Sequence, residues 1–454
     1  EADRHGAHYA NGTVTTPPGY KPAMQAWIES GWQGVAAPEA QGGQGLPHAV
    51  WTAVTELAST ADMAFFLGPI LTAGAIDLLM GHATEEQQQK WLPKLVTGEW
   101  NGTMCLTEPQ AGSDLAALRT RAEDLGDGRY ALHGQKIYIT WGEHDCTDNI
   151  LHLVLARLPG APEGSRGISL FAAPKVLPDG ARNALRCGGI EKKMGIHASP
   201  TCVMLFEGAE AELVGEPNRG LNAMFAMMNA ARLAVGVQGV GAGSKALALA
   251  EAYAAQRSQS GRAIADHPDV ARMLREMRAV TLACRLLALE AAVQLDRHHL
   301  LGEDTAATRL ALLIPIVKAW CTDRGVEIAS TGIQVHGGMG FVEDSGAAQV
   351  LRDVRITPIY EGTNGIQAID LLVRKLARDG GAAMSALLDE VAAIPRLAEA
   401  ASRLREATTT MLALQARDPE AAQSLAAPYL DACGWVLGGW MLARAAAADP
   451  DREG

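Results

Sequence analysis

Cysteine is sparse in this chain of 454 residues. There are seven cysteines, an odd number, and no two of them form a C-x-x-C pair. This scattered set argues against a disulfide framework and a structural zinc site and for a reducing compartment, so we expect a cytoplasmic protein. No unbroken apolar run reaches the roughly 18 residues that a membrane-spanning helix needs, so we expect no membrane partner.

Positive charge is also in short supply. Lys and Arg total 39 against 51 Asp and Glu, which gives a net charge of −12. This excess of negative charge argues against a general nucleic-acid-binding protein, although it is compatible with a local basic pocket for an anionic ligand. Hydrophobic residues make up 48% and charged residues 20%, as in ordinary globular proteins, and the length suggests about three domains.

Several motifs of other enzyme classes are missing. No serine has glycine two positions before and two positions after it, which excludes the nucleophile elbow of α/β-hydrolases, and no Walker A sequence occurs. The glycines within 236–243 are spaced like a dinucleotide fingerprint, but no strand precedes them, so they predict close helix packing. The pair His298 and His299 lacks further ligands at metal-binding spacing, so we expect a solvated helix end and no metal site.

The hydrophobic pattern divides the chain into three parts. Helical periodicity runs from about 22 to 95 and returns from about 221 to the end, whereas short β-like runs fill 103–215. Because helices and strands are segregated, a doubly wound α/β sheet is disfavoured. The clearest predicted strands are 130–133 and 136–140, which a turn would join, followed by 150–155, 168–171 and 202–206.

Three segments carry specific motifs. They are MCLTEPQAGSDL at 104–115, QVHGGMGF at 334–341 and RDVRITPIYEGTNGIQ at 352–367. In this order and spacing they resemble the signatures of the acyl-CoA dehydrogenase family of flavoenzymes, and the resemblance extends from about 22 to 376. The segments WGEHD at 141–145 and GIHASP at 195–200, with further helices after 382, resemble the longer branch that includes 3-methylmercaptopropionyl-CoA dehydrogenases.

This resemblance implies a mainly α-helical fold with a central β-domain. We expect an N-terminal helical domain over 1–101, a middle β-barrel or sandwich over 102–217, a four-helix bundle over 218–378 and an extra helical segment over 379–454. FAD would lie extended between the β-domain and the bundle, with its adenosine end against a neighbouring subunit. The resemblance therefore also implies a homodimer or homotetramer.

The implied reaction is the α,β-dehydrogenation of an acyl-CoA thioester to the trans-2-enoyl-CoA. It needs a carboxylate base in an apolar slot, where desolvation raises the pKa of the base toward working pH. Glu361 stands at the family's base position in the Tyr-Glu-Gly-Thr motif, and its backbone N–H would bind the thioester carbonyl together with the flavin ribityl hydroxyl. Sequence texture alone leaves open that Glu361 caps a helix or pairs with Arg355.

Further site residues follow from the resemblance position by position. Tyr138 and Thr140 match an aromatic-x-Thr strand that packs on the flavin, although a strand-core role for Tyr138 is the alternative. Arg257, Gln334 and Gly338 would bind the FAD of a neighbouring subunit. Ser113 would reach the pyrophosphate of FAD, outside this cross-subunit site. Ser260 departs from the family, which usually has Phe there, and the segment 258–267 is short. The other implied FAD-binding residues are Met104, Leu106, Thr107 and Thr363.

Substrate contacts are implied for two positions on the helix after 221. Asn229 and Arg232 stand where the family often has an Asp and an Arg that meet acyl-CoA, although a polar pair on the helix surface is the alternative. Gly362 would allow a close approach of the backbone to substrate and flavin. The remaining implied substrate-binding residues are Ser113 and Tyr360.

The expected substrate is 3-methylmercaptopropionyl-CoA or a short- to medium-chain acyl-CoA. The expected electron acceptor is an electron-transferring flavoprotein. Two alternatives share the fold: a flavin oxidase that uses oxygen, and a non-catalytic flavin-containing DNA-binding relative. The second alternative is disfavoured because the tail from 378 to 454 has no Lys/Arg cluster, so we expect no nucleic-acid partner.

Overall fold

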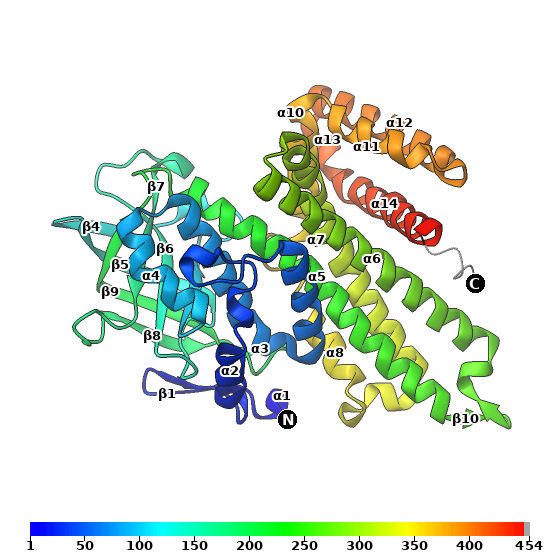
Figure 1. Cartoon of the computed structure of the whole chain (residues 1–454), viewed down its shortest axis with the longest axis horizontal. Coiled ribbons are helices and arrows are strands. Elements are labelled where there is room, and N and C mark those ends of the chain that lie inside the picture. The colour runs from blue at the N-terminus through cyan, green and yellow to red at the C-terminus, as the bar shows by residue number, and fades with distance from the viewer. Residues whose placement is uncertain (449–454) are drawn as a thin grey trace. The chain divides into compact units, whose positions relative to one another are not determined.

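The computed structural model describes residues 1–448, and the chain forms two compact units (Figure 1). Unit 1 comprises residues 1–46 and 64–231, and unit 2 comprises residues 47–63 and those from 232 onward. Two long helices, α3 (His48–His82) and α5 (Gly220–Gln256), contribute to both units. Residues 449–454 of the predicted C-terminal segment lie outside the described residues.

Unit 1 begins with short helices and a small hairpin. Thr84 caps α4 through a capping box with Gln87, and Gly98 ends this helix in a left-handed conformation with φ 84°. Helix α3 is interrupted at Asp62, whose φ of −151° is not helical. The elements before the sheet are α1 (Ala2–His5), β1 (His8–Ala10), β2 (Thr13–Thr15), α2 (Tyr20–Glu29), η1 (Trp32–Gly34), η2 (Glu39–Gln41), the second half of α3, and α4 (Glu85–Thr97).

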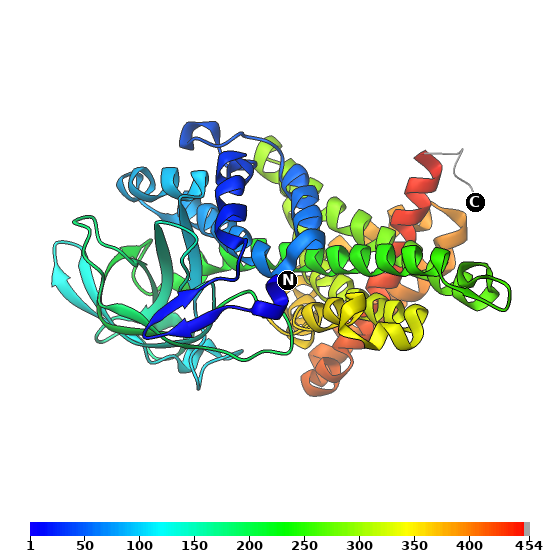
Figure 2. The ribbon, with the colours of Figure 1, turned by 90° about the horizontal axis from the view of Figure 1, so that it is seen from below.

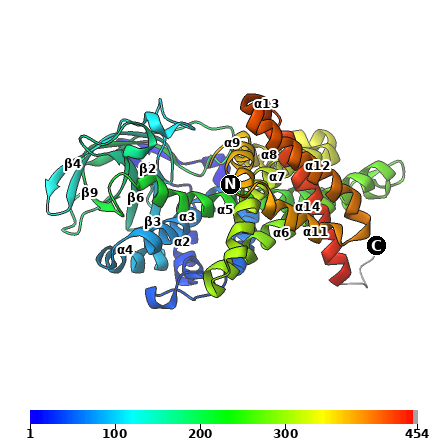
Figure 3. The same ribbon diagram turned by 90° about the horizontal axis from the view of Figure 1, so that it is seen from above.

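The seven-stranded sheet of unit 1 closes on itself. Its order is β3-β6-β4-β5-β9-β7, with β8 beside β9, and a further pairing of β6 with β7 completes a barrel (Figures 2 and 3). Strand β6 is buried over nearly its whole length, as a central strand should be. The strands are β3 (Trp100–Cys105), β4 (Arg121–Gly126), β5 (Arg129–Thr140), β6 (Asn149–Arg157), β7 (Ile168–Pro174), β8 (Leu185–Ile190) and β9 (Thr201–Val214).

One local prediction is wrong. The segments 130–133 and 136–140 are not two strands joined by a turn, because β5 runs through both of them without a break. Gly134 makes this continuity possible: a Cβ at this position would lie 2.4 Å from the Thr120 side-chain oxygen. The glycine therefore marks a close approach of β5 to the residue before β4, and the pairing of β5 with β9 shifts register nearby, where the sequence pattern suggested a reversal of the chain.

Unit 2 is a bundle of long helices in which α6 and α7 lie side by side (Figure 1). Two residues, Ser260 (φ 53°) and Gly261 (φ 82°), form the tight turn of the hairpin β10–β11, which explains how the short segment 258–267 connects α5 to α6. The elements are α5, β10 (Ser258–Gln259), β11 (Arg262–Ala263), η5 (Ile264–Asp266), α6 (Pro268–Leu301), α7 (Asp304–His336), η6 (Gly337–Phe341), η7 (Glu343–Ser345), α8 (Ala347–Val354) and α9 (Asn364–Asp370).

The glycines of α5 serve close helix packing, as predicted. A Cβ on Gly236 would lie 2.7 Å from Val317, and one on Gly239 would lie 2.5 Å from the carbonyl oxygen of Cys321, both on α7. By composition α3 and α5 could cross a membrane, but 78% and 72% of their most apolar windows are buried inside the protein. Both are therefore core helices.

The helices after residue 376 share the core of α6 and α7. Trp320 of α7 is buried against α14, where a Cβ on Gly434 would lie 2.1 Å from the indole ring. The elements of this region are a π-helical turn (Leu371–Leu376) that continues α9, then α10 (Ala377–Asp379), α11 (Ala382–Ala392), η9 (Pro395–Leu397), α12 (Ala398–Arg417), α13 (Pro419–Ser424) and α14 (Ala426–Ala448). The predicted order of a helical part, a β part and a second helical part is confirmed.

Candidate active site

The turn before α9 in unit 2 presents Glu361. Glu361 and Gly362 both have left-handed backbones, with φ of 56° and 84°. This conformation is costly for a glutamate, so the surrounding structure must hold it. The buried side chain of Gln367 donates hydrogen bonds to the carbonyl oxygens of both residues, each at 3.3 Å, and the Thr363 hydroxyl caps α9 by accepting from the Ile366 N–H at 3.3 Å.

The carboxyl group of Glu361 is desolvated and has no hydrogen-bond or ion-pair partner among residues 1–448. Burial raises its pKa to about 7, against the opposing charges of Arg232 and Lys318. Within residues 1–448 it forms no ion pair with Arg355, and the N-cap of α9 is Thr363, so neither alternative role of Glu361 is found. Within the same residues its backbone N–H meets no protein acceptor, which leaves this donor available to a ligand.

Two side chains of α5, Gln238 and Arg232, lie beside this turn. Tyr360, whose pKa burial raises, donates its hydroxyl hydrogen to Gln238. Arg232 is 4% exposed, pairs with Asp370 at 3.4 Å and lies close to Gly362, because a Cβ on Gly362 would be 3.8 Å from its guanidinium. A helix-surface role is therefore wrong for Arg232, whereas Asn229, in the preceding turn of α5, is exposed.

The predicted cross-subunit residues lie at two neighbouring helix ends of unit 2. Arg257 directly follows α5, and Gln334 is in the last turn of α7. The rings of Tyr253 and His336 stack with their centroids 4.6 Å apart, which brings these helix ends together. Gln334, Arg257 and Gly338 of η6 are all exposed, so each is accessible to a ligand or to another chain.

In unit 1 the segment after β3 carries Met104, Leu106 and Thr107, all partly buried. The carbonyl oxygen of Thr107 accepts the Ile137 N–H at 2.9 Å, and that of Leu106 accepts the Lys136 ammonium at 2.9 Å. Strand β5 therefore fixes the main chain of this segment through one backbone N–H group and one lysine side chain. Ser113, farther along the loop, is exposed.

Sequence reasoning missed the residues that anchor this loop. Lys136 is 0% exposed and Glu108 is 4% exposed, and their charged groups pair at 2.8 Å. The Glu108 carboxylate also accepts the backbone N–H groups of Arg119 and Thr120 at 2.7 and 3.0 Å. Burial alone would raise the pKa of Glu108, but Lys136 and these hydrogen bonds hold it at about 2. The available signal was a lysine inside a predicted strand, directly before the hydrophobic residues 137–139.

Tyr138 and Thr140 lie on the same strand as Lys136. Tyr138 has a φ of 60° at an irregularity in the pairing of β5 with β9, and its side chain is 60% exposed. The alternative of a strand-core aromatic residue is therefore wrong. Thr140, at the end of β5, is partly buried and pairs with Thr201. An exposed aromatic ring and a nearby hydroxyl suit the face and the edge of a planar heteroaromatic ring.

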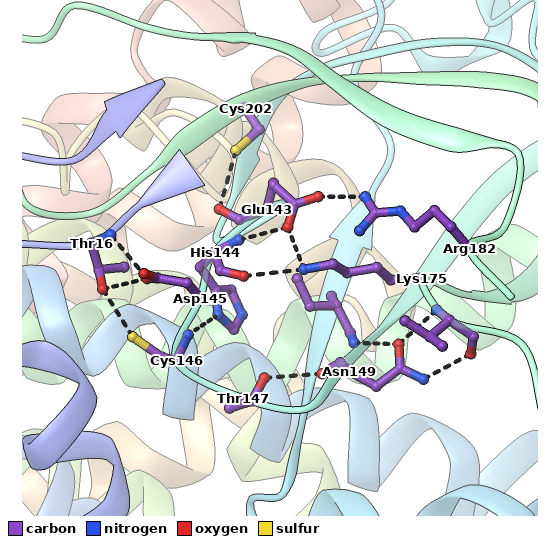
Figure 4. Close-up of polar contacts among 12 residues, drawn as sticks. Thr16, Glu143, His144, Asp145, Cys146, Thr147, Asn149, Lys175, Arg182 and Cys202 are labelled. Atoms are coloured by element: carbon purple, nitrogen blue, oxygen red, sulfur yellow. Dashed lines mark hydrogen bonds and ion pairs between the residues drawn. The ribbon is translucent and has the colours of Figure 1, made fainter. Parts of the chain in front are cut away.

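The chain directly after Thr140 is held by a polar cluster (Figure 4). Glu143, which is buried, forms ion pairs with Lys175 and, at 2.5 Å, with Arg182. Asp145 accepts the Thr16 N–H at 3.0 Å and hydroxyl at 2.7 Å, so it ties this segment to the N-terminal residues. These contacts give the segment 141–145 a structural role in fixing the end of β5. Within residues 1–448, no three or more His, Cys, Asp or Glu side chains lie together in a way that could hold a metal ion.

Comparison with known families covers almost the entire chain. Models of the acyl-CoA dehydrogenase N-terminal, middle and C-terminal domains match residues 4–99, 103–209 and 218–376, and an acetyl-CoA dehydrogenase C-terminal-like model matches 373–454. The chain belongs to the acyl-CoA dehydrogenase family. The predictions of an FAD-dependent acyl-CoA dehydrogenase, with FAD as cofactor and acyl-CoA as substrate, are thereby confirmed.

Individual relatives agree with this assignment. The chain is 46% identical over 478 aligned positions to 3-methylmercaptopropionyl-CoA dehydrogenase of Ruegeria pomeroyi, covering 98% of this chain and 81% of the relative. The butyryl-CoA dehydrogenase structure from Megasphaera elsdenii matches with a TM-score of 0.69 and 27% identity over 77% of this chain and 88% of that one. ACDH-11 of Caenorhabditis elegans shares the fold, with a TM-score of 0.84 at 23% identity, over 98% of this chain and 79% of that one.

Proposed function

We propose that Glu361 is the base that removes the α-proton of the acyl-CoA thioester. The observation that carries this proposal is a desolvated carboxyl group with a pKa raised to about 7 and no direct ion pair within residues 1–448. Above this pH the group is ionised and can accept a proton. Because proton uptake removes a charge that burial disfavours, the same environment strengthens the base.

The turn around Glu361 orients the thioester in this proposal. The backbone N–H of Glu361 donates to the thioester carbonyl oxygen, where negative charge develops as the proton leaves. Gly362 lets the substrate approach the backbone, and Tyr360, Arg232, Asn229 and Ser113 complete the proposed substrate contacts. Bound FAD supplies the acceptor for the hydride that leaves the β-carbon.

The residues of unit 1 that fit a flavin are Thr107, Tyr138 and Thr140. Their support is the exposed ring of Tyr138 and the fixed main chain at Thr107 and Thr140. We propose that Met104 and Leu106 border the same ring system and that Ser113 binds the pyrophosphate. Thr363 already caps α9, so we assign it a supporting part in cofactor binding.

We propose a homodimer or homotetramer in which Arg257, Gln334 and Gly338 bind the FAD of a neighbouring copy. Their support is their exposure at two helix ends that lie together. The cytoplasmic location and an electron-transferring flavoprotein as acceptor remain predictions from the sequence. The similarity to 3-methylmercaptopropionyl-CoA dehydrogenase supports a thioether or short- to medium-chain acyl-CoA as substrate.

The decisive variant is Glu361→Gln, which preserves size and polarity but cannot accept the proton. We expect it to retain FAD and to change the flavin spectrum when acyl-CoA is added, while anaerobic flavin reduction slows by about 10²–10⁴-fold or more. The measurement is stopped-flow absorbance of the flavin. Reduction at close to the wild-type rate would place the base elsewhere in the chain.

Substrate and acceptor are tested with a panel of acyl-CoA thioesters. Because of the similarity to 3-methylmercaptopropionyl-CoA dehydrogenase, we expect the highest kcat/KM with 3-methylmercaptopropionyl-CoA or a short- to medium-chain substrate. One methylene in a pocket changes discrimination between substrates by about 1–3 kcal/mol, so the panel can resolve the preferred chain length. A maximum with long-chain substrates would contradict this proposal. Rapid reoxidation by air with formation of hydrogen peroxide, in place of transfer to an electron-transferring flavoprotein, would favour the oxidase alternative.

A further inference from the structure

A lysine lies buried in the helix beside the proposed base. Lys318 of α7 is 0% exposed, and the residues on both sides of it in the helix, Val317 and Ala319, are buried and apolar. Its ammonium donates one hydrogen bond, to the Asn364 side-chain oxygen at 2.9 Å. Within residues 1–448 it forms no direct ion pair. Because an isolated buried cation is unfavourable, its presence needs a physical reason.

The hydrogen-bond partner Asn364 joins Lys318 to the turn that carries Glu361. Asn364 is the first residue of α9, three positions after Glu361. Its side-chain N–H₂ group donates to the Ala319 carbonyl at 3.1 Å, the Thr322 hydroxyl at 3.0 Å and the Asp323 carboxylate at 2.8 Å, all on α7. The start of α9, and with it the turn before α9, is therefore fastened to α7 at Lys318.

The charges around Lys318 come from three elements. They are Glu361 in the turn, Asp323 on α7 itself and Arg232 on α5. Burial lowers the pKa of Lys318 to about 7, while Glu361 and Asp323 act in the opposite direction. Asp323 is itself occupied by Asn364, and burial raises its pKa. Lys318 and Glu361 therefore titrate in the same pH range and influence one another.

We infer that Lys318 is a positioning residue for the base: through Asn364 it holds the Glu361 turn against α7, and its positive charge favours the ionised, proton-accepting form of Glu361. This inference rests on the proposed role of Glu361. It assigns two separable contributions to Lys318, a hydrogen bond that sets geometry and a charge that sets the fraction of Glu361 ready to react.

The charge is tested with Lys318→Met in the FAD-loaded enzyme. Anaerobic flavin reduction by butyryl-CoA is followed by stopped flow from pH 6 to pH 9. We expect the acid limb of the rate profile to move up by about one pH unit, which is a roughly tenfold slower reaction below the midpoint. The rates should approach wild type at high pH. The control Lys245→Met removes a partly exposed lysine of α5, whose ammonium binds the Ala61 carbonyl, and should leave the profile unchanged.

The two contributions are separated by further variants. Lys318→Gln keeps a donor for Asn364 without the charge, so it should show the same shift of the acid limb with a smaller loss of the limiting rate. It also serves if Lys318→Met does not retain FAD. Asn364→Ala keeps the charge but removes the fastening, so we expect a slower limiting rate with an unshifted acid limb.

The outcome distinguishes this inference from the proposed function. If Glu361→Gln abolishes flavin reduction while Lys318→Met and Lys318→Gln titrate like wild type, Lys318 is only structural and the inference is overturned. A rate loss that is equal at all pH values overturns it as well. If Glu361→Gln still reduces its flavin, the proposed function itself fails, whatever the lysine variants show.

Discussion

Each unit contains a buried lysine that acts on a glutamate, yet the two glutamates behave in opposite ways. In unit 1, Glu108 and Lys136 touch at 2.8 Å, and the pKa of Glu108 is held at about 2. In unit 2, Lys318 binds an amide oxygen, Glu361 has no direct partner within residues 1–448, and burial raises its pKa to about 7. The same residue types thus give a permanent anion in one place and a titrating acid in the other.

The difference shows that contact, more than burial, decides what a buried carboxylate can do. The Glu108 carboxylate is occupied by an ammonium, two backbone N–H groups and the Thr120 hydroxyl, so it cannot take up a proton near neutral pH. Glu361 interacts electrostatically with Arg232 and Lys318 but forms no hydrogen bond or ion pair with either of them. It therefore keeps an accepting lone pair, while Lys318 and Arg232 limit how far its pKa rises.

The largest contrast is expected from removing each lysine. Lys136→Met leaves Glu108 buried without its cation, so we expect a loss of about 3–5 kcal/mol in the free energy of unfolding and a weaker hold on FAD. Lys318→Met removes a cation that forms no ion pair within residues 1–448, so the stability of this variant should stay within about 1 kcal/mol of wild type. Urea unfolding with FAD bound measures both variants. Equal losses would mean that the two lysines have the same structural role.

The pH dependence separates activity from folding. Flavin reduction should fall about tenfold per pH unit below about 7, because Glu361 becomes protonated. The folded-state pKa of Glu108 lies below its ordinary value of 4.5, so its contribution to stability is complete above 4.5 and is lost only as the pH falls toward 2. Between pH 5 and pH 6 the enzyme should therefore be slow but folded, as circular dichroism and stopped flow can show together. Unfolding that accompanies the loss of activity in this range would contradict the comparison.

The smallest effect is expected at the helix cap that follows the base. Thr363→Ala removes the acceptor for the Ile366 N–H, so we expect a loss of about 1 kcal/mol in the free energy of unfolding. Thr363→Ser retains the hydroxyl and should restore most of the stability. Thermal unfolding measures the difference. Loss of FAD from Thr363→Ala without loss of stability would instead indicate direct contact with the cofactor.

The sequence predicted Glu361 because a compact motif carries it, and it predicted the order of helical and β regions because periodicity is a local property. It could not predict the partners of the charged residues. Lys318 lies 43 positions before Glu361 in an apolar stretch of helix, where nothing local indicates what its ammonium faces. Glu108 and Lys136 likewise form their ion pair because the fold places β5 beside the loop after β3. The prediction of a turn between 133 and 136 was wrong for the same reason, since Gly134 packs against Thr120, which lies 14 positions earlier and directly precedes β4.

The packing of Gly434 on Trp320 has a consequence for the proposed base. Helix α14 shares one core with α7 and α9, the two helices that the hydrogen bond from Lys318 to Asn364 joins. Because α14 covers the apolar faces of both helices, it excludes water there and contributes to the burial that lowers the pKa of Lys318. Helix α14 therefore helps to keep the local dielectric low around the two helices that carry Lys318 and Asn364.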